Sequence, residues 1–550
     1  MTKIKITYKN KEYEYDRDIS LLDISKDFKG DYKKDIIAGS INNRVVNLST
    51  KLSKSSNIDF YDTTSVIGRK TYLRGLYYLF IKAVKDVLNV DVKIKCFIGN
   101  GVYCEILTNN LISEVTVEKI KIRMKEISNS NIPISRIMVS RIESMDYFNN
   151  VNQLDKSKSL RFISNSTISL YKLDNTLDYF YGVLPCSTSY IKTFNLKFLG
   201  DNKVALLPPI LYEEDEKLKY DKNEALLKVV DKNAKFLENI SINTSVELND
   251  LVSTGEYGDL IRLSEEHQIN NLFKLAHQIT SNKDIKMVLI TGPTSSGKTT
   301  IAKKLSYILR SFGKSPINIS VDDFYIDMKD RVKDEEGNPE IERIEAFDTN
   351  LFNKKVSGLL DKKEVALPKY DFIEGKKSFD EIHKTKMTDN SILVVEGIHA
   401  FNEKLTEIIP DKNKFKVFIN PITPLNIDNH NMFKTSDNRL LRRIIRDNKG
   451  RGASASKTLE MWKKVRKVEE EVIFPYMEEA DVIFNTSLVY ELGVLKTYAE
   501  PLLFSVPEDD INYDYAIRLI NIFRVILAIP SEDVPKDSII REFIGGSCFK

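Results

Sequence analysis

Hydrophobic and polar residues follow two different patterns along the chain. The first pattern, a simple alternation, occupies the first 62 residues. There, apolar and polar positions alternate over short stretches separated by turn residues, which predicts β-hairpins. Asn42-Asn43 is a favourable pair for the tight turn of one hairpin. The predicted elements are strands over 3–8, 12–15, 36–41, 44–48 and 57–61 and a short helix over 21–28. Together they predict a small β-grasp domain over residues 1–62.

The second pattern begins at residue 286, where short apolar runs alternate with segments whose apolar residues recur at helical spacing. This alternation is typical of a parallel α/β sheet. The expected strands are 286–290, 315–321, 391–395, 415–419 and 481–485, and the expected helices are 301–309, 351–360, 437–447 and 456–471. We therefore predict an α/β domain over 286–500. The C-terminal segment, 501–550, is expected to hold one apolar helix over 513–529 and a Gly-rich tail.

Residues 213–285 are rich in charge and are expected to be mostly helical, with a turn-rich break over 251–258. Pro and Gly are too few there for a flexible linker. We therefore predict a structured helical connector over 226–285.

Composition adds limits on the class of protein. A chain of 550 residues is expected to hold several domains, and its net charge of +3 gives no sign of nucleic acid or of a membrane surface as partner. The four cysteines are too far apart for a zinc site, and such sparse use suits a reducing cytosol. The N-terminus lacks the apolar core of a signal peptide, and no apolar stretch reaches membrane-spanning length. We expect a cytoplasmic protein without a membrane partner; a homo-oligomer is left open.

The stretch from Thr291 to Thr300 carries the P-loop pattern G-x-x-x-x-G-K-[ST] between an expected strand and an expected helix. In that setting backbone N–H groups and the helix N-terminus bind phosphate oxygens, which leaves a chance match in a Ser/Gly-rich turn as the weaker alternative. Lys298 would reach the outer phosphates, and the Thr299 hydroxyl would hold Mg²⁺. The residues expected to bind ATP here are Gly292, Pro293, Thr294, Ser295, Ser296, Gly297, Lys298, Thr299 and Thr300.

Two acidic residues stand where strands of the expected sheet end, which is where ligands bind in open α/β sheets. Asp322 could take the proton of an attacking hydroxyl, although an Asx turn or helix cap is an equal alternative. Whether the adjacent Asp323 shares this role is left open. Glu396 ends an apolar strand of Walker-B form and could order Mg²⁺ through water.

Four arginines, Arg439, Arg442, Arg443 and Arg446, recur at i, i+3, i+4 and i+7 and so share one face of a helix, with Arg451 following. Arginines can stabilise the charge of a transferring phosphoryl group. The usual alternative for such a face is a solvated surface.

Over about 286–490 these motifs resemble the uridine kinase and phosphoribulokinase family. Its marks are the P-loop, Asp322-Asp323-Phe324-Tyr325, Leu367 to Phe372, Glu396 to Phe401 and Arg439 to Asp447. The resemblance implies that Asp322 deprotonates the sugar 5′-hydroxyl, with Lys298 and Arg443 as further catalytic residues, and that Thr299 and Glu396 serve the metal. It also implies that Tyr325, Glu345 and Tyr370 bind the nucleoside and that Arg443, Arg446 and Arg451 belong to a lid over ATP.

Two departures from this family fall near the acceptor or the lid. Gly375 stands where uridine kinases have a histidine that helps to recognise the base, and the segment 421–435, with His430, is longer than the family's link. Both leave base specificity open.

Upstream, residues 1–62 resemble a TGS domain, and residues 63–225 resemble the second additional domain of threonyl-tRNA synthetase, an α+β domain. The matching stretches are Ile37 to Asn42, Val45 to Leu48, Phe97 to Tyr103 and Tyr181 to Cys186. The synthetase's editing histidines are replaced here by Arg74, Tyr78 and Tyr190, although Cys186 is kept. We therefore expect no editing or metal site in this half, and Cys186 is expected to be a small buried residue.

The whole order resembles bacterial nucleoside kinase-like proteins that fuse TGS and synthetase-type domains to such a kinase. We expect an ATP- and Mg²⁺-dependent nucleoside kinase, most simply for uridine or cytidine. A kinase of another sugar or sugar phosphate, or an RNA- or translation-associated regulatory P-loop ATPase that uses the first half to bind RNA, is left open.

Overall fold

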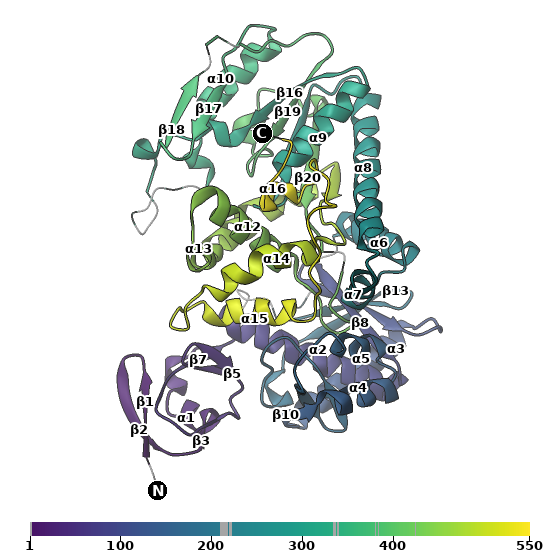
Figure 1. Ribbon diagram of the computed structural model, residues 1–550, viewed down its shortest axis with the longest axis vertical. Coiled ribbons are helices and arrows are strands. Elements are labelled where there is room, and N and C mark those ends of the chain that lie inside the picture. Colours follow the sequence, from purple (N-terminus) through teal and green to yellow (C-terminus); the bar gives the residue numbers. More distant parts are fainter. Residues whose placement is uncertain are drawn as a thin grey trace.

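The helices and strands of the chain fall into consecutive groups, which Figure 1 shows from the N-terminal group at the bottom to the P-loop sheet at the top. The structure is a computed structural model that describes residues 3–549 except 210–217, 219, 221–222, 334–336, 338–339, 341, 380, 383 and 424. None of the helices in this described part combines the length and apolar character needed to cross a membrane.

Residues 3–62 form a five-stranded mixed sheet in the order β2-β1-β7-β4-β5, packed on the short helix α1. β1 pairs with β7 in parallel, and the other neighbours are antiparallel. The elements are β1 (Lys3–Tyr8), β2 (Lys11–Asp16), β3 (Ile19–Ser20), α1 (Leu21–Ser25), β4 (Ile36–Ile41), β5 (Arg44–Val46), β6 (Lys51–Leu52) and β7 (Ser56–Asp62). The predicted strands and the turn at Asn42-Asn43 are confirmed. The helix is shorter than predicted, and the TGS assignment stays a prediction.

The next group holds two antiparallel sheets, β13-β14-β9-β8 and β10-β11-β12, packed around the long helix α2. Its elements are α2 (Val66–Leu88), β8 (Asp91–Ile98), β9 (Gly101–Leu107), α3 (Glu114–Asn129), β10 (Ile134–Ser140), α4 (Arg141–Asn150), α5 (Leu154–Leu160), β11 (Thr167–Leu173), β12 (Thr176–Asp178), β13 (Asn195–Gly200) and β14 (Lys203–Leu207). The Ser65 hydroxyl accepts the Gly68 N–H and begins α2.

Three helices connect this group to the P-loop sheet, as predicted: α6 (Glu224–Asn239), α7 (Ser245–Thr254) and α8 (Tyr257–Ser281). The break between α7 and α8 is narrower than predicted, because Gly255 in a left-handed conformation ends α7 and α8 starts two residues later. The boundary predicted at residue 225 falls inside α6. Most of the stretch 213–222, predicted to be helical, lies outside the described residues.

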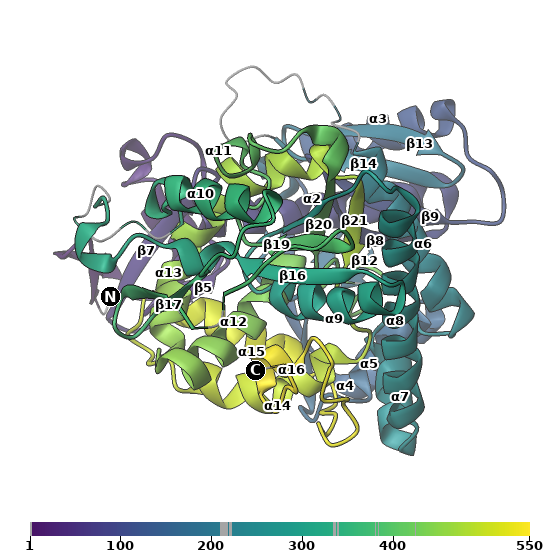
Figure 2. The ribbon, with the colours of Figure 1, turned by 90° about the horizontal axis from the view of Figure 1, so that it is seen from above.

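The C-terminal half is built on a parallel sheet in the order β16-β19-β15-β20-β21, which confirms the predicted α/β fold. Figure 2 shows α8 and α9 on one side of its strands. The elements up to its last strand are β15 (Met287–Thr291), α9 (Lys298–Ser311), β16 (Ser315–Ser320), α10 (Thr349–Leu360), β17 (Pro368–Asp371), β18 (Lys376–Phe379), β19 (Ser391–Glu396), α11 (Glu403–Thr406), β20 (Lys414–Asn420), α12 (Thr435–Arg451), α13 (Ala455–Val468) and β21 (Val482–Asn485). β15 and β19 are buried throughout, as a covered parallel sheet requires.

The C-terminal segment differs from the prediction. A helix missed from the sequence, α14 (Glu491–Phe504), runs through the boundary predicted at 500, with Pro501 inside it. The predicted helix over 513–529 ends early, as α15 (Tyr513–Phe523), and α16 (Arg541–Ile544) follows. The Lys496 ammonium donates hydrogen bonds to the carbonyls of Phe523 and Ile526. The buried Asn249 amide donates to the Val525 carbonyl and accepts the Leu527 N–H. These contacts with neighbouring elements replace the next helical turn.

The long segment 421–435 ties the two halves of the chain together through buried polar contacts. Its Asn429 carbonyl accepts the Ile94 N–H at 2.7 Å, and the His430 ring lies 2.7 Å from Asp91 and 2.8 Å from Asp178. Lys156 completes this buried network beside Asp178. Because buried charges need partners, the network fixes the P-loop half against the preceding domain.

Candidate active site

The phosphate-binding loop joins β15 to α9, and its two motif glycines are required by their surroundings. A Cβ on Gly292, whose φ is 151°, would lie 2.1 Å from the Ile419 carbonyl oxygen. Gly297 has a φ of 86°, and a Cβ there would lie 2.6 Å from Ile539. The loop therefore takes a conformation open only to glycine at both positions.

Buried side chains hold the outer carbonyls of this loop. Arg439 donates to the Thr294 carbonyl at 3.1 Å, and Arg442 donates to the Ser295 carbonyl at 3.4 Å. The Thr486 hydroxyl donates to the Ser296 carbonyl at 2.6 Å. The carbonyls are thus engaged from outside the loop.

Both arginines are neutralised by buried carboxylates, so they belong to the frame of the loop rather than to a lid. Arg439 makes a two-pronged pair with Glu469 at 2.5 and 2.8 Å, and Arg442 pairs with Glu491. The opposite, apolar face of α12 is buried as well. The arginine face is therefore not a solvated surface, and two of its four arginines frame the loop.

The remaining arginines, Arg443, Arg446 and Arg451, gather around Asp447. Arg443 and Arg446 donate to its carboxylate at 3.1 and 3.3 Å, and Arg451 lies 3.5 Å from it. Arg443 also reaches the Thr294 hydroxyl of the P-loop at 3.4 Å. Their exposure increases along the helix, from a buried Arg443 to a half-exposed Arg451.

Lys298 and Glu396 lie at the inner end of the loop. The Lys298 ammonium donates to the carbonyls of Gly292 and Pro293, both at 3.1 Å. Burial lowers the Lys298 pKa, and the charges of Glu396 and Asp322 oppose that shift. Both predicted acids therefore lie within electrostatic reach of the P-loop lysine.

Three oxygen-bearing side chains meet beside Lys298. The hydroxyls of Thr299 and Ser320 donate to Glu396 at 3.2 and 2.9 Å. Burial raises the Glu396 pKa to about 7, helped by the negative charge of Asp322. An all-oxygen group with one carboxylate is what Mg²⁺ prefers when nucleotide phosphates complete its coordination, so these residues fit that ion.

Asp322 and Asp323, whose roles the sequence left unresolved, have different surroundings. Asp323 accepts the Tyr370 N–H at 3.1 Å and pairs with Lys369 at 3.2 Å, so it fastens β17. Asp322 makes no side-chain hydrogen bond within the described part of the chain. Burial raises its pKa, and the positive charges of Lys298, Arg451 and Arg446 oppose that shift. Of the two aspartates, Asp322 is thus the one whose carboxylate has no hydrogen-bond partner among the described residues.

Glu345 does not join this group. Its side chain is 53% exposed and pairs with Lys404 at 3.4 Å. Glu342, which was not predicted from the sequence, takes this place near the P-loop. Burial raises the pKa of Glu342 to about 7, and its charge interacts with those of Arg443, Asp322 and Lys298. A carboxylate three residues from a motif position gives no signal in the sequence, so only the fold separates the two glutamates.

Tyr325 and Tyr370 lie in an aromatic cluster next to Asp322. Tyr325 stacks on Phe347 with ring centres 4.2 Å apart and lies 5.5 Å from Tyr370. Arg331, also missed from the sequence, lies over Tyr325 and donates to the Tyr370 hydroxyl at 2.6 Å. The cluster gives the site an apolar wall with one cation.

Gly375 contacts the start of the segment that holds Arg331. Its φ is 67°, and a Cβ there would lie 2.9 Å from the Met328 Cβ. A histidine side chain therefore has no room at this position, which makes the departure from uridine kinases a structural one.

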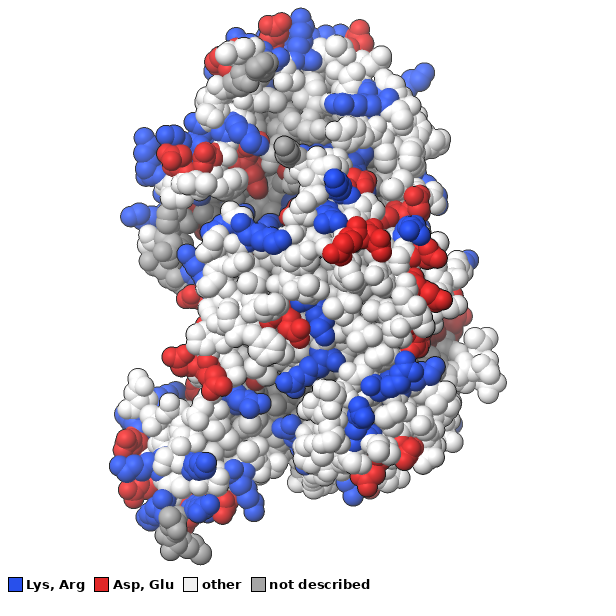
Figure 3. All heavy atoms as spheres, in the orientation of Figure 1, with Lys and Arg blue, Asp and Glu red and all other residues white. Residues whose placement is uncertain are grey.

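The surface is hollowed near these residues. Figure 3 shows the hollow between the part that carries β17 and β18 and the part that carries α12 and α13, with acidic and basic side chains at its edge.

The C-terminal segment also reaches the P-loop, where the Thr300 hydroxyl donates to Glu542 at 2.6 Å. That contact, too, had no signal in the sequence.

The positions that replace the synthetase's editing histidines have structural partners. Arg74 donates to the Val183 carbonyl at 2.8 Å, and the Tyr78 hydroxyl bonds to the carbonyls of Tyr171 and Thr176. Cys186 is half-buried, which raises the pKa of its thiol.

Comparison with known proteins agrees with both halves of this description. The model of the phosphoribulokinase/uridine kinase family matches residues 287–491. A uridine kinase from Borrelia duttonii is 31% identical over 220 residues, which is 39% of this chain and 95% of that kinase. A solved structure of a possible uridine kinase from Bacillus stearothermophilus is 20% identical, covering 40% of this chain and 98% of that one, with a TM-score of 0.27.

The first half matches a different class. A threonine–tRNA ligase from Carboxydothermus hydrogenoformans is 26% identical over 196 residues, which is 35% of this chain but only 31% of the ligase. Such ligases match the N-terminal region.

The uridine kinase of Borrelia is matched almost from end to end, and the P-loop, its framing arginines and Asp322 lie within the span of the family model. The chain therefore belongs to the phosphoribulokinase/uridine kinase family and is a P-loop kinase, a phosphate-transferring enzyme.

Proposed function

We propose that this kinase transfers the γ-phosphate of ATP to the 5′-hydroxyl of a pyrimidine nucleoside, uridine or cytidine. The observation that carries the proposal is the difference between the adjacent aspartates: Asp323 is held by β17, whereas Asp322 is free and within reach of the charges of Lys298 and Arg446. A free carboxylate beside cations suits proton removal from a hydroxyl next to a phosphate. The matched relatives named uridine kinase support the choice of acceptor.

In the proposed reaction Asp322 takes the hydroxyl proton while the acceptor oxygen forms a bond to the γ-phosphorus. The bond from that phosphorus to the bridging oxygen of ADP breaks in line, and its electron pair stays on ADP. Lys298 turns from the loop carbonyls to the phosphates, and Arg443 and Arg446 stabilise the charge that develops on the transferring group.

Thr299, Ser320 and Glu396 would hold Mg²⁺. The bound ion would neutralise phosphate charge and orient the γ-phosphate. Thr299 and Ser320 keep the Glu396 carboxylate turned toward the P-loop.

On the acceptor side we assign the sugar hydroxyls to Glu342 in place of Glu345, and the base to the wall formed by Tyr325 and Tyr370. The support is that Glu342 shares the electrostatic environment of Asp322, whereas Glu345 pairs with Lys404 at the surface. Because Gly375 replaces the histidine of uridine kinases, another sugar or a sugar phosphate is the alternative acceptor.

A second role concerns the first half of the chain, which we propose to be a TGS-like and synthetase-like regulatory part that associates with RNA. The match to threonine–tRNA ligases favours it. Binding of the full chain to transfer RNA, measured with and without ATP, tests this role; failure to bind at physiological salt would exclude it.

The proposed function is tested by incubating the purified chain with ATP, Mg²⁺ and a panel of nucleosides, sugars and sugar phosphates. We expect nucleoside monophosphate from uridine or cytidine and none from the Lys298→Ala chain. Phosphorylation of a sugar phosphate alone would move the acceptor to the alternative class. ATP hydrolysis without any phosphorylated acceptor would refute the proposal that the enzyme transfers phosphate to a nucleoside or sugar.

Asp322→Asn is expected to lower turnover by about two to four orders of magnitude, because the acceptor hydroxyl loses its base. ATP affinity is expected to stay close to wild type. The matched control is Asp323→Asn, which keeps the base and loosens β17, so its turnover should fall far less. Equal losses in the two variants would remove Asp322 as the base.

Glu342→Gln is expected to raise the KM of the nucleoside about tenfold or more, since a hydrogen bond to a charged group contributes roughly 1.5–3 kcal/mol. The KM of ATP should change little. Glu345→Gln is the control and is expected to resemble wild type. The opposite ranking of the two variants in steady-state kinetics would restore Glu345 as the acceptor residue.

The Mg²⁺ concentration that the enzyme needs for activity is expected to depend on pH, because Glu396 titrates. Because its pKa is raised to about 7 by burial and by Asp322, Glu396 is protonated below that pH and binds the cation weakly. The Mg²⁺ concentration for half-maximal activity should therefore rise as pH falls from 8 to 6. Glu396→Gln should need more Mg²⁺ at all pH values and lose this dependence; a variant that keeps the same pH profile would contradict the assignment.

A further inference from the structure

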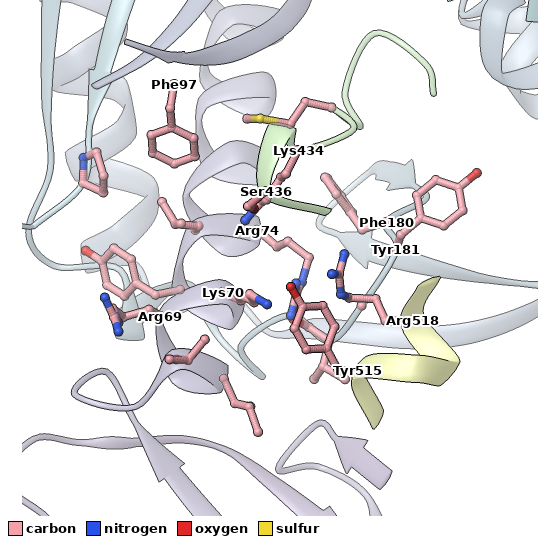
Figure 4. A pocket seen from close by; sticks show the side chains of 18 of the residues that line it. Arg69, Lys70, Arg74, Phe97, Phe180, Tyr181, Lys434, Ser436, Tyr515 and Arg518 are labelled. Atoms are coloured by element: carbon pink, nitrogen blue, oxygen red, sulfur yellow. The ribbon is translucent and has the colours of Figure 1, made fainter. Parts of the chain in front are cut away.

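A large open cavity lies between the N-terminal sheet, the synthetase-like part and the C-terminal helices, and Arg439 of the P-loop frame is part of its lining. Its volume is about 2560 Å³. Figure 4 shows its floor, where Lys70 and Arg74 on α2 point toward Lys434 at the start of α12 and Arg518 on α15. Three elements far apart in sequence thus bring cations to one place.

Most of these cations lack a carboxylate partner. Lys70, Arg74 and Lys434 form no ion pair within the described part of the chain. Arg518 is matched by a two-pronged pair with Asp437 at 2.7 and 2.9 Å. The other acid at the floor, Asp514, has its pKa raised by burial and accepts the Val45 N–H. The four cations thus face two carboxylates, Asp437 and Asp514, and the floor keeps a formal excess of two positive charges.

The unpaired cations are held close together instead of spreading into solvent. Lys70 lies over the Tyr515 ring at 4.1 Å, and Lys434 lies 5.9 Å from the centre of the Phe97 ring. Burial lowers the Lys70 pKa and lowers the Lys434 pKa to about 8, and the charges of Arg518 and Arg74 lower both further, against the pull of Asp437. An anion placed among these groups would relieve that repulsion.

The start of α12 adds to the same potential. This 17-residue helix begins after Lys434 without a side-chain cap, and Lys434 and Ser436 line the cavity. The first N–H groups of a helix and its dipole favour negative charge. The uncapped start and the unpaired cations are independent features that both favour an anion.

We propose that this floor binds a small phosphate compound with two or more negative charges, such as a pyrophosphate or triphosphate group. The site is built by Lys70, Arg74 and Lys434 together with the first turn of α12. Its charge excess matches a multiply charged group, and the rings of Phe97 and Tyr515 beside it leave room for a compound that carries an organic part.

A nucleic-acid polymer fits these observations less well. Polymers bind through extended basic stripes that neutralise many phosphates. Here the unpaired cations are gathered on the cavity floor instead of forming a stripe. The occupant is therefore expected to enter the cavity whole.

Calorimetric titration of the full chain with sodium pyrophosphate at constant ionic strength tests the proposal. In the Lys298→Ala variant the P-loop loses its main phosphate contact. Pyrophosphate binding that remains in this variant is therefore attributed to the cavity. We expect one binding event in that background. Changing Lys70 and Lys434 to Gln should weaken it about tenfold or more, since each tenfold step is about 1.4 kcal/mol. The exposed Lys412→Gln is the matched control and should bind as before.

The unfolding temperature of each variant, measured without ligand, verifies that it is folded, and the single Lys434→Gln change serves if the double variant does not fold. Pyrophosphate should raise the unfolding temperature of the Lys298→Ala chain. Absence of binding in that background would overturn the proposal. So would binding that survives loss of Lys70 and Lys434, or single-stranded RNA binding that pyrophosphate does not compete with. Because no acceptor is present, these results do not depend on the proposed nucleoside kinase activity.

Discussion

Two buried arginines of α12, Arg439 and Arg442, impose the constraint on which the kinase half depends. Each holds a carbonyl of the phosphate-binding loop, and each is almost completely excluded from solvent. A buried guanidinium is tolerated only with a carboxylate in good geometry. Glu469 comes from the turn after α13, and Glu491 is the first residue of α14. Shaping the P-loop therefore also fixes where α13 ends and where α14 begins.

The same constraint explains why both faces of α12 are buried up to its last turn. Its apolar residues enter the core formed with α14 and α15, while its arginines face the loop. The C-terminal segment closes the arrangement from the other direction, because Ile539 packs where a side chain on Gly297 would lie and Glu542 takes the Thr300 hydroxyl. Residues far beyond the last strand of the sheet thus belong to the phosphate site.

The sequence predicts those parts of the molecule that local patterns determine. Apolar runs predicted the parallel sheet, and the glycine pattern predicted the P-loop. Asp322 was singled out because it follows the end of the strand that is β16. Helical spacing placed four arginines on one face, but it could not separate Arg439 and Arg442 from Arg443 and Arg446, since their partners come from other elements. Glu342 and Glu345 differ only in which way a short segment turns. Helix α14 was not predicted, and burial of its apolar residues stabilises it although Pro501 lies inside it.

The position of α12 also relates the two halves of the chain. Its 17 residues span roughly 25 Å. Its first turn lies at the cavity floor beside Lys70, and Arg439 and Arg442, one and two turns further along, hold the P-loop. The segment 421–435, which leads into it, is fixed to the preceding domain by the buried His430 network. A helix buried on both faces moves as a unit or not at all, because packed interiors do not deform continuously. The first half of the chain is therefore packed against the helix whose arginines hold the P-loop.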